Sequence, residues 1–443
     1  MRGLRFVILL VIAIPIAWYA YYDSKKGPVD DSPKLAKVFT VEADKIDELE
    51  IKSESGDRTS LRRKGTDWEI VQPVAAPSDQ SAVSGITSNL ASIEIQRVID
   101  EKPADLKEFG LAEPRVEVAF KSNGQQRTLQ LGQKTPSGTD VYAKLAGDAK
   151  VFLVSSYLDS TLNRSTFDLR DKSVLRLDRE KIDTMEVNAA GRTSRFEKKS
   201  GEWQIAEPPA GRADFSAIDG LVSRVSSVQM KSIVPDATDL KTFGLDKPAV
   251  SVRLGSGSSQ ATLLVGKAAE GEAGSVYAKD LSRPAVFTID SALVDDLKKD
   301  ASEYRQKDLF DARSFSTTRL EIVRNGQTTV FEKAKVKDKD GKEEEKWRQT
   351  APAARDVDAA KIEALISAAT GARANSFVDS TAKTGLDKPA LSMTFKYDEG
   401  KEERVTFARS GDAAYAARAG SPGAAKIDAS VIDGIVKALE DVK

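Results

Sequence analysis

The sequence predicts an α+β fold: three tandem, mainly antiparallel modules of about 135 residues behind one N-terminal transmembrane helix. The first observation is that three tryptophans each lie five residues before a proline: Trp68, Trp203 and Trp347. Their spacings are 203 − 68 = 135 and 347 − 203 = 144 residues. The second is a Gly-Leu-x-x-Pro motif that follows each tryptophan, at 110–114, 244–248 and 385–389. The third is an uncharged stretch at residues 6–22.

This stretch predicts a membrane anchor, because it runs for 17 residues without a charge and a spanning helix needs roughly 17–25 residues. Arg2 and Arg5 precede it, so the positive-inside rule places residues 1–5 in the cytoplasm. Residues 23–36 then form a polar linker, and the bulk of the chain lies in the periplasm behind a bacterial inner membrane. The alternative is a cleaved signal peptide, with Ala17-Trp-Tyr-Ala20 as the nearest approach to a cleavage site. Both interpretations export the protein.

The rest of the chain divides into three repeat modules, at 37–170, 171–308 and 309–443. Each opens with alternating apolar and polar residues, which predict a half-buried strand, at 46–51, 182–187 and 319–322. A turn and a return strand follow, and the tryptophan strand comes third. In the third copy Phe331 and Trp347 are 16 residues apart, whereas Leu61 and Trp68 are 7 apart. This difference of nine residues predicts a longer hairpin.

An amphipathic helix is predicted after each tryptophan strand, over 79–93, 214–228 and 356–372. Three aspartates are placed to cap these helices: Asp79, Asp214 and Asp356. The glycine of Gly-Leu-x-x-Pro suits a positive φ, and its leucine can fill a core. Four more strands are predicted in the first copy, with counterparts in the others, at 116–120, 128–132, 141–144 and 151–154. The last strand leads to a short helix, such as 431–439.

Composition argues against several functional classes. Lys and Arg number 67 against 68 Asp and Glu, a net charge of −1, whereas nucleic-acid-binding domains are usually basic. The chain contains neither cysteine nor histidine. A Ser-His-Asp triad, a thiolate nucleophile and histidine metal ligands are therefore excluded. We expect a non-enzymatic protein with no metal and no cofactor.

A recurring Tyr-Ala-Lys strand is the candidate for partner binding. Its alternate residues could line a basic face for an anionic glycan or a protein partner, although a solvated strand edge is the simpler explanation. The residues concerned are Tyr142, Lys144, Tyr277, Lys279, Tyr415 and Arg418. The tryptophans lie in alternating strands, which predicts that they are core residues rather than stacking platforms for a ligand.

Together these motifs resemble a bacterial family of unknown function whose membrane-anchored, triplicated modules occur beside genes for gliding-motility-type ABC transporters. The resemblance covers residues 37–443 and is specific in the first two copies. The third copy departs from it with Thr384 in place of phenylalanine and Ala417-Arg418 in place of lysine. The resemblance implies an accessory or scaffold role beside the permease and ATPase of an ABC transporter, with no catalytic residues to carry over. The alternatives are a protein that binds cell-wall or surface polysaccharide and, third, a carboxylate-dependent enzyme.

Overall fold

The computed structural model describes residues 18, 21, 35–207, 210–337, 343–398 and 400–442. The chain separates into two compact units, Met1–Asp171 and Lys172–Lys443, and the second unit contains two of the three sheets. The predicted anchor lies outside the described residues, apart from Trp18 and Tyr21. So do the predicted cytoplasmic residues and most of the linker. Within the described part, no helix is long and apolar enough to cross a membrane.

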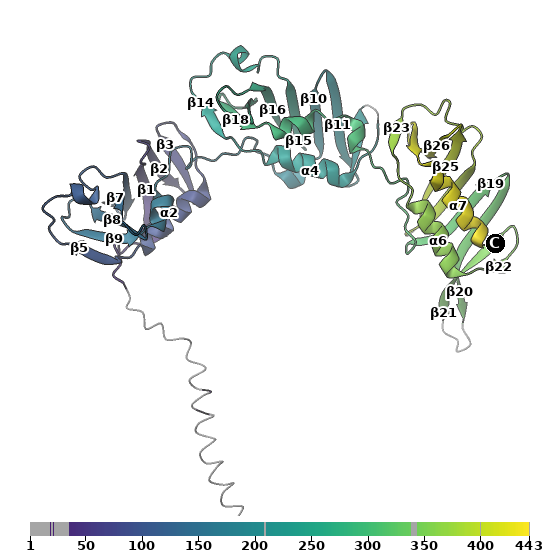
Figure 1. Cartoon of the computed structure of the whole chain (residues 1–443), viewed down its shortest axis with the longest axis horizontal. Coiled ribbons are helices and arrows are strands. Elements are labelled where there is room, and N and C mark those ends of the chain that lie inside the picture. Colours follow the sequence, from purple (N-terminus) through teal and green to yellow (C-terminus); the bar gives the residue numbers. More distant parts are fainter. Residues whose placement is uncertain are drawn as a thin grey trace, which may run out of the picture. The chain divides into compact units, whose positions relative to one another are not determined.

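The same nine-stranded antiparallel sheet is built three times (Figure 1). In the first sheet the strands lie in the order β4-β3-β2-β1-β6-β7-β8-β9-β5, and the other two sheets repeat this order. The first four strands of each module form one half of its sheet. The four strands after the Gly-Leu-x-x-Pro crossover form the other half, together with the short edge strand that precedes the crossover. The two halves join where β1 pairs with β6, β10 with β15 and β19 with β24. Repetition of the fold, inferred from the motif spacing, is confirmed.

Strands and helices follow one another in the same order in all three modules. The first module contains β1 (Ile46–Lys52), β2 (Arg58–Lys64), β3 (Asp67–Gln72), β4 (Ala76–Pro77), α2 (Gln80–Ser92), β5 (Arg97–Asp100), β6 (Val116–Ser122), β7 (Gln125–Lys134), β8 (Asp140–Leu145), β9 (Val151–Ser155) and α3 (Tyr157–Leu162). The second contains β10 (Thr184–Ala189), β11 (Arg192–Lys199), β12 (Glu202–Glu207), β13 (Gly211–Arg212), α4 (Phe215–Ser226), β14 (Ser232–Val234), β15 (Val250–Ser256), β16 (Ser259–Ala268), β17 (Ser275–Asp280), β18 (Val286–Asp290) and α5 (Ala292–Leu297). The third contains β19 (Thr317–Arg324), β20 (Gln327–Lys337), β21 (Glu343–Ala351), β22 (Arg355–Asp356), α6 (Ala359–Thr370), β23 (Ser376–Val378), β24 (Leu391–Tyr397), β25 (Lys401–Ser410), β26 (Ala413–Arg418), β27 (Ala424–Ile427) and α7 (Ala429–Val442).

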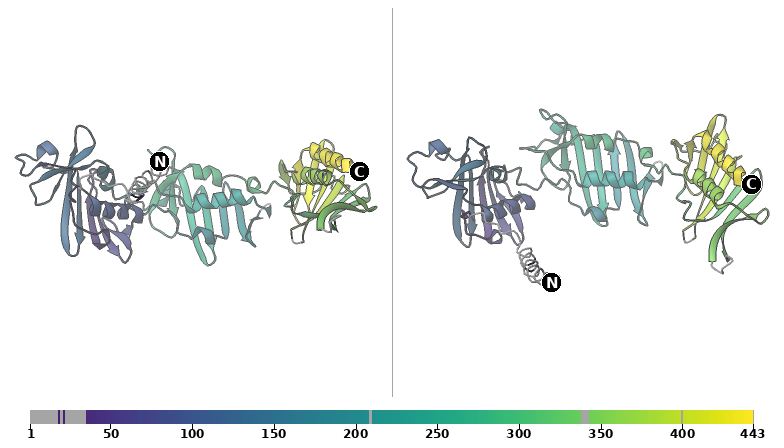
Figure 2. Two further views of the ribbon diagram at one scale, coloured as in Figure 1. Left: turned by 90° about the horizontal axis from the view of Figure 1, so that it is seen from below. Right: turned by 60° about the horizontal axis from the view of Figure 1, so that its bottom comes forward.

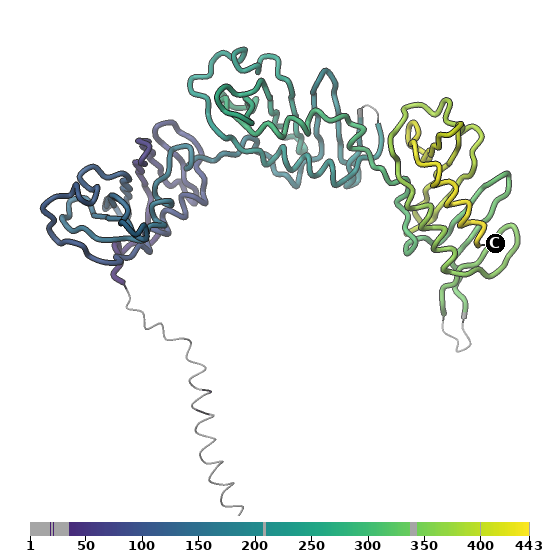
Figure 3. Tube along the Cα trace, in the orientation of Figure 1, coloured from purple at the N-terminus to yellow at the C-terminus, as the bar shows by residue number. Residues whose placement is uncertain are grey.

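The modules are mostly β rather than α+β, which corrects the predicted fold class. Short edge strands such as β4 and β5 are too brief to show an alternating pattern, and the sequence analysis assigned no strand to them. Hairpin strands such as β7 also extend beyond the apolar residues that revealed them, because cross-strand hydrogen bonds continue into polar sequence. Figure 2 shows the strands of the second module side by side with α4 across one face, and Figure 3 follows the chain through each module.

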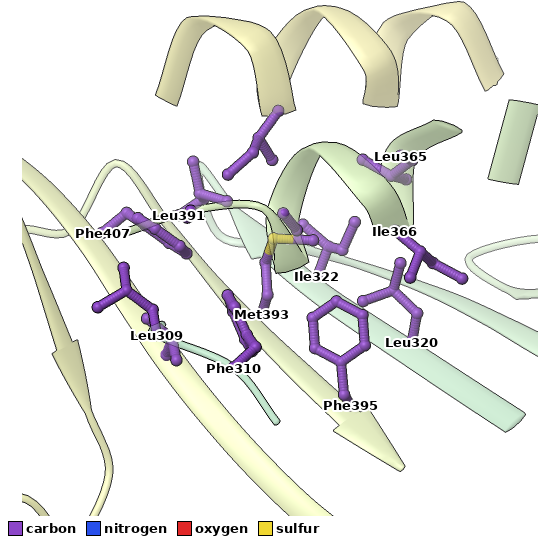
Figure 4. Close-up of a cluster of buried hydrophobic side chains, with 14 of the residues drawn as sticks. Leu309, Phe310, Leu320, Ile322, Leu365, Ile366, Leu391, Met393, Phe395 and Phe407 are labelled. Carbon is purple, nitrogen blue, oxygen red and sulfur yellow. The ribbon is translucent and has the colours of Figure 1, made fainter. Parts of the chain in front are cut away.

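Each core forms between the sheet and the long helix. In β6 buried and half-buried residues alternate along the strand, as expected when one face is packed. Trp68, Trp203 and Trp347 are only 2%, 3% and 4% exposed, so their predicted core role is confirmed. Figure 4 shows the core of the third module, where apolar side chains of α6 meet those of β19, β24 and β25. Full burial of one such side chain stabilises the fold by roughly 1.5–3 kcal/mol.

The predicted aspartate caps are correct in two modules and misplaced in the third. Asp79 accepts a hydrogen bond from Ala82 N, and Asp214 accepts one from Ala217 N. In the third module Asp358 caps α6, whereas Asp356 belongs to the edge strand β22. The prediction chose the first aspartate after the proline. The repeat spacing points to the second, because 214 + 144 = 358.

The third module also has a longer final helix. Helices α3 and α5 span six residues each, while α7 spans 14. Figure 1 shows α7 beside α6, and the two helices are in contact. Ile432, Ile435, Leu439 and Val442 bury the apolar face of α7 in the core. A helix is therefore present at 431–439 as predicted, and it extends beyond the predicted bounds at both ends.

Candidate functional site

In the first two modules, the tyrosine and lysine of the Tyr-Ala-Lys strand lie on the face of the sheet opposite the core. Val141 and Ala143 of β8 point into the core, so Tyr142 and Lys144 point to the other face. The ring of Phe109, from the crossover, lies 5.1 Å from that of Tyr142. In the second module, Phe243 and Tyr277 repeat this contact at 4.9 Å.

The two lysines that were expected to form a basic rim are buried. Lys144 and Lys279 are each only 9% exposed, and the Lys279 ammonium donates to the carbonyl of Arg283. Burial also lowers the pKa of Lys279. Sequence reasoning placed these residues on the correct face but missed the burial of the two lysines. Partner binding through these residues stays a prediction.

Close approach of the crossover to the sheet depends on glycine. A Cβ on Gly132 or Gly266 would clash with the carbonyl oxygen of Phe109 or Phe243. Gly110 has a φ of 66° and Gly244 a φ of 67°, in the left-handed region that was predicted for this motif. These glycines let the crossover lie directly on β7 and β16.

In the third module the predicted pair Tyr415 and Arg418 does not form one surface. Strand β26 pairs with β25 in an unbroken register, with Tyr415 opposite Ala408 and Arg418 opposite Val405. Residues three apart on a strand point to opposite faces. Tyr415 corresponds to Tyr142 and Tyr277, but Ala417 occupies the position of the lysine. Matching Arg418 to lysine by charge alone ignored the two-residue period of the strand.

Arg418 instead belongs to an ion-pair network around a buried glutamate. Its Nη1 lies 2.8 Å from Oε2 of Glu403, and its Nη2 lies 2.9 Å from Oδ2 of Asp311. The Glu403 side chain is 1% exposed and accepts hydrogen bonds from the backbone nitrogens of Asp311 and Ala312, at 3.0 and 2.7 Å. Sequence reasoning missed Glu403. The available signal was an acidic residue at an inward position of an alternating strand.

The segment 305–313 connects the second and third modules and is hydrogen-bonded to both; we call it the connecting segment. Gln306 N donates to Arg212 O at 2.9 Å, and Ala374 N donates to Lys307 O at 2.8 Å. Two successive residues are therefore bonded to different modules. Arg212 also forms an ion pair with Asp311, so one carboxylate bridges Arg212 and Arg418.

A small pocket of about 50 Å³ opens beside this segment. Its lining includes Arg212, Arg305, Arg418 and Phe377, together with the β26–β27 turn. Arg305 is only 5% exposed, and its guanidinium carbon lies 4.0 Å from the centre of the Phe377 ring. Burial lowers the pKa of this guanidinium from its usual value. Across the described residues, no group of three or more acidic side chains is arranged to hold a metal ion.

The tryptophan strands carry a second recurring feature, a cross-strand basic residue over each indole. Arg63 lies over Trp68 at 4.9 Å, Lys198 over Trp203 at 5.7 Å and Lys333 over Trp347 at 5.4 Å. Each cation covers one face of its indole ring. Cation–π contacts of this kind stabilise by roughly 0.5–1 kcal/mol at exposed sites.

These features define a tandem-repeat protein built from three antiparallel sheet modules. The chain belongs to the family described as domain of unknown function (DUF4340), whose profile matches residues 68–204 and 203–389. Both matches begin in a tryptophan strand. The boundaries of the family profile therefore differ from those of the sheets, whose first strands are β1 and β10. None of the curated proteins matches the chain.

Proposed function

We propose that this protein is a non-enzymatic scaffold anchored in the bacterial inner membrane, with its three modules in the periplasm. The observation that carries the proposal is the threefold repetition of one sheet with the same strand order. Three similar modules on one chain present similar surfaces several times. Linked binding surfaces gain avidity because the second contact is intramolecular.

The junction between the second and third modules supports a scaffold role. Residues 306 and 307 hydrogen-bond to different modules, which leaves no free linker at this point. The ion pairs from Asp311 to Arg212 and Arg418 strengthen the same junction. A scaffold benefits from such a connection, since fixed spacing between binding surfaces limits the entropy lost when a large partner binds.

The proposed partner is the permease and ATPase complex of an ABC-type transporter, in line with the gliding-motility-type gene context of the family that the sequence resembles. The uncharged run at 6–22 supplies the proposed anchor. The test is a pull-down of the tagged full-length protein from its own membranes in mild detergent, read by mass spectrometry. A matched protein with an unrelated membrane anchor is the control. Co-purification of permease and ATPase with both versions supports recognition through the modules.

Two other outcomes would argue against the transporter proposal. If the transporter is recovered only with the native anchor, the modules are not the binding element. If wall polymer alone is recovered, polysaccharide binding takes first place. The burial of Lys144 and Lys279 does not favour that role, and it stays a prediction, as does carboxylate-dependent catalysis. The buried acids Asp159, Asp280 and Glu403 lie in different modules, and each is ion-paired with an arginine.

A further inference from the structure

The pocket at the connecting segment carries more positive than negative charge. Its lining contains Arg212, Arg305 and Arg418 together with Asp308, and Arg313 and Arg373 line a neighbouring pocket that shares Asp308. These arginines are accompanied by three carboxylates, those of Asp308, Asp311 and Glu403. The five arginines thus have three carboxylates among them at ion-pair distance, and Asp379 and Glu202 act on Arg305 and Arg212 only from farther away. Excess charge is costly where side chains are withdrawn from water.

Arg305 is the arginine without a paired carboxylate. Asp311 forms ion pairs with Arg212 and Arg418, and Glu403 forms one with Arg418. Asp308 forms ion pairs with Arg313 and Arg373, at 3.2 and 3.0 Å. Within the described residues, no carboxylate lies within ion-pair distance of Arg305, and its Nη1 makes no hydrogen bond. This buried guanidinium therefore has no paired carboxylate and no acceptor at Nη1, and the charge of Asp379 acts on it only from beyond ion-pair distance.

The aromatic contact does not remove this deficit. The Phe377 ring lies against the Arg305 guanidinium carbon at 4.0 Å, and such a contact contributes through the face of the guanidinium plane. The N–H donors point outward within that plane, so an acceptor must approach from the edge. Gly211 lies beside Nε and Nη2, where a Cβ would come within 3.3 and 3.2 Å, which leaves room there for only a small group.

We propose that this pocket binds a small oxyanion, a carboxylate or phosphate group, which forms an ion pair with Arg305 as Asp311 does with Arg212. The volume of about 50 Å³ is only a few times the ~10–15 Å³ that one water molecule needs by the same measure, so it suits a single oxyanion group rather than a whole metabolite. Arginine recognises carboxylate and phosphate oxygens through paired N–H donors. This proposal concerns the junction alone and does not depend on a transporter partner.

The test uses the full-length protein in mild detergent with sodium phosphate or sodium acetate, at an ionic strength held constant with sodium chloride. We expect a saturable rise in the Tm of the second unit, of roughly 2–4 °C. We also expect slower hydrogen exchange in residues 305–313. A response to acetate alone would identify a carboxylate ligand, and a response to phosphate alone a phosphoryl group.

Two variants and a control localise the effect. Arg305→Met keeps an apolar stem against Phe377 but should abolish both responses. Arg253→Met removes a half-exposed arginine of β15 and should leave both responses intact. Ser421→Asp places a carboxylate in the pocket lining, and it should raise the Tm without added oxyanion and remove the dependence on it.

The proposal is overturned if neither phosphate nor acetate changes the Tm or the hydrogen exchange of the wild-type protein. It is also overturned if Arg305→Met responds like the wild type. Should Arg305→Met fail to fold, Ser421→Asp decides the matter, because a protein that still responds to oxyanion as the wild type does would place the binding site elsewhere.

Discussion

Replacing Glu403 by glutamine should destabilise the third module by about 2–4 kcal/mol. The carboxylate is almost fully buried, lies 2.8 Å from Arg418 and accepts two backbone N–H groups of the connecting segment. Removal of one partner of a buried ion pair typically costs about 3–5 kcal/mol. We expect a somewhat smaller loss because Arg418 would not be left unpaired in the variant. It retains its ion pair with Asp311 at 2.9 Å, and its side chain is 19% exposed, so part of its charge stays solvated.

The assay is native-state hydrogen exchange on peptides from α6 and β25, which reports the opening free energy of this module within the whole chain. Glu402→Gln is the matched control, because Glu402 is the neighbouring residue, its side chain is 54% exposed and it lies 3.5 Å from Lys396. The control should change the free energy by less than about 0.5 kcal/mol. A loss below about 1 kcal/mol for Glu403→Gln, or a loss equal to that of the control, would refute the reasoning.

Three further predictions concern a helix cap, a close approach and a titration. Asp358→Ala should cost about 1 kcal/mol in urea unfolding, whereas Asp356→Ala, at a side chain 88% exposed, should cost less than about 0.5 kcal/mol; equal costs would contradict the revised cap. Gly266→Ala should lower stability by roughly 1–3 kcal/mol or more through its clash with the crossover, while Ala408→Gly, at the matching position, should cost at most about 1 kcal/mol; thermal unfolding compares the two. Burial raises the pKa of Tyr304 to about 12, so the unfolded chain loses this phenol proton first, near pH 10. Stability should therefore fall between about pH 10 and pH 12, and urea unfolding of Tyr304→Phe at pH 9 and pH 11.5 should show a smaller fall than the wild type.

Regular patterns in the sequence predicted the repeated parts of the fold well. The motif spacing revealed three copies, because each tryptophan occupies the same buried place in its sheet. Alternation located most of the long strands, and helical spacing located α2, α4 and α6. These signals work because burial of one face imposes a period on the residues that form it.

Features that depend on tertiary contacts were missed. The contact of Phe109 with Tyr142 depends on the close approach of the crossover at Gly132, a residue that carries no pattern of its own. Glu403 looks like one more acid in a charged strand until the connecting segment brings two backbone N–H groups to it. The face of Arg418 could have been derived from strand parity, since Tyr415 lies three residues before it. Sequence reasoning followed charge there instead of geometry.

The connecting segment also affects how such a chain can be divided or recombined. A fragment that starts at residue 309, where the sequence repeat starts, would lose the bond from Ala374 to Lys307 and the ion pair from Asp311 to Arg212. The sequence repeat starts at residue 309, whereas the part of the chain that we expect to unfold cooperatively with the third sheet starts earlier, in the connecting segment. Exchange of the third copy between related chains should succeed only when residues 305–313 and their arginine partners are transferred together.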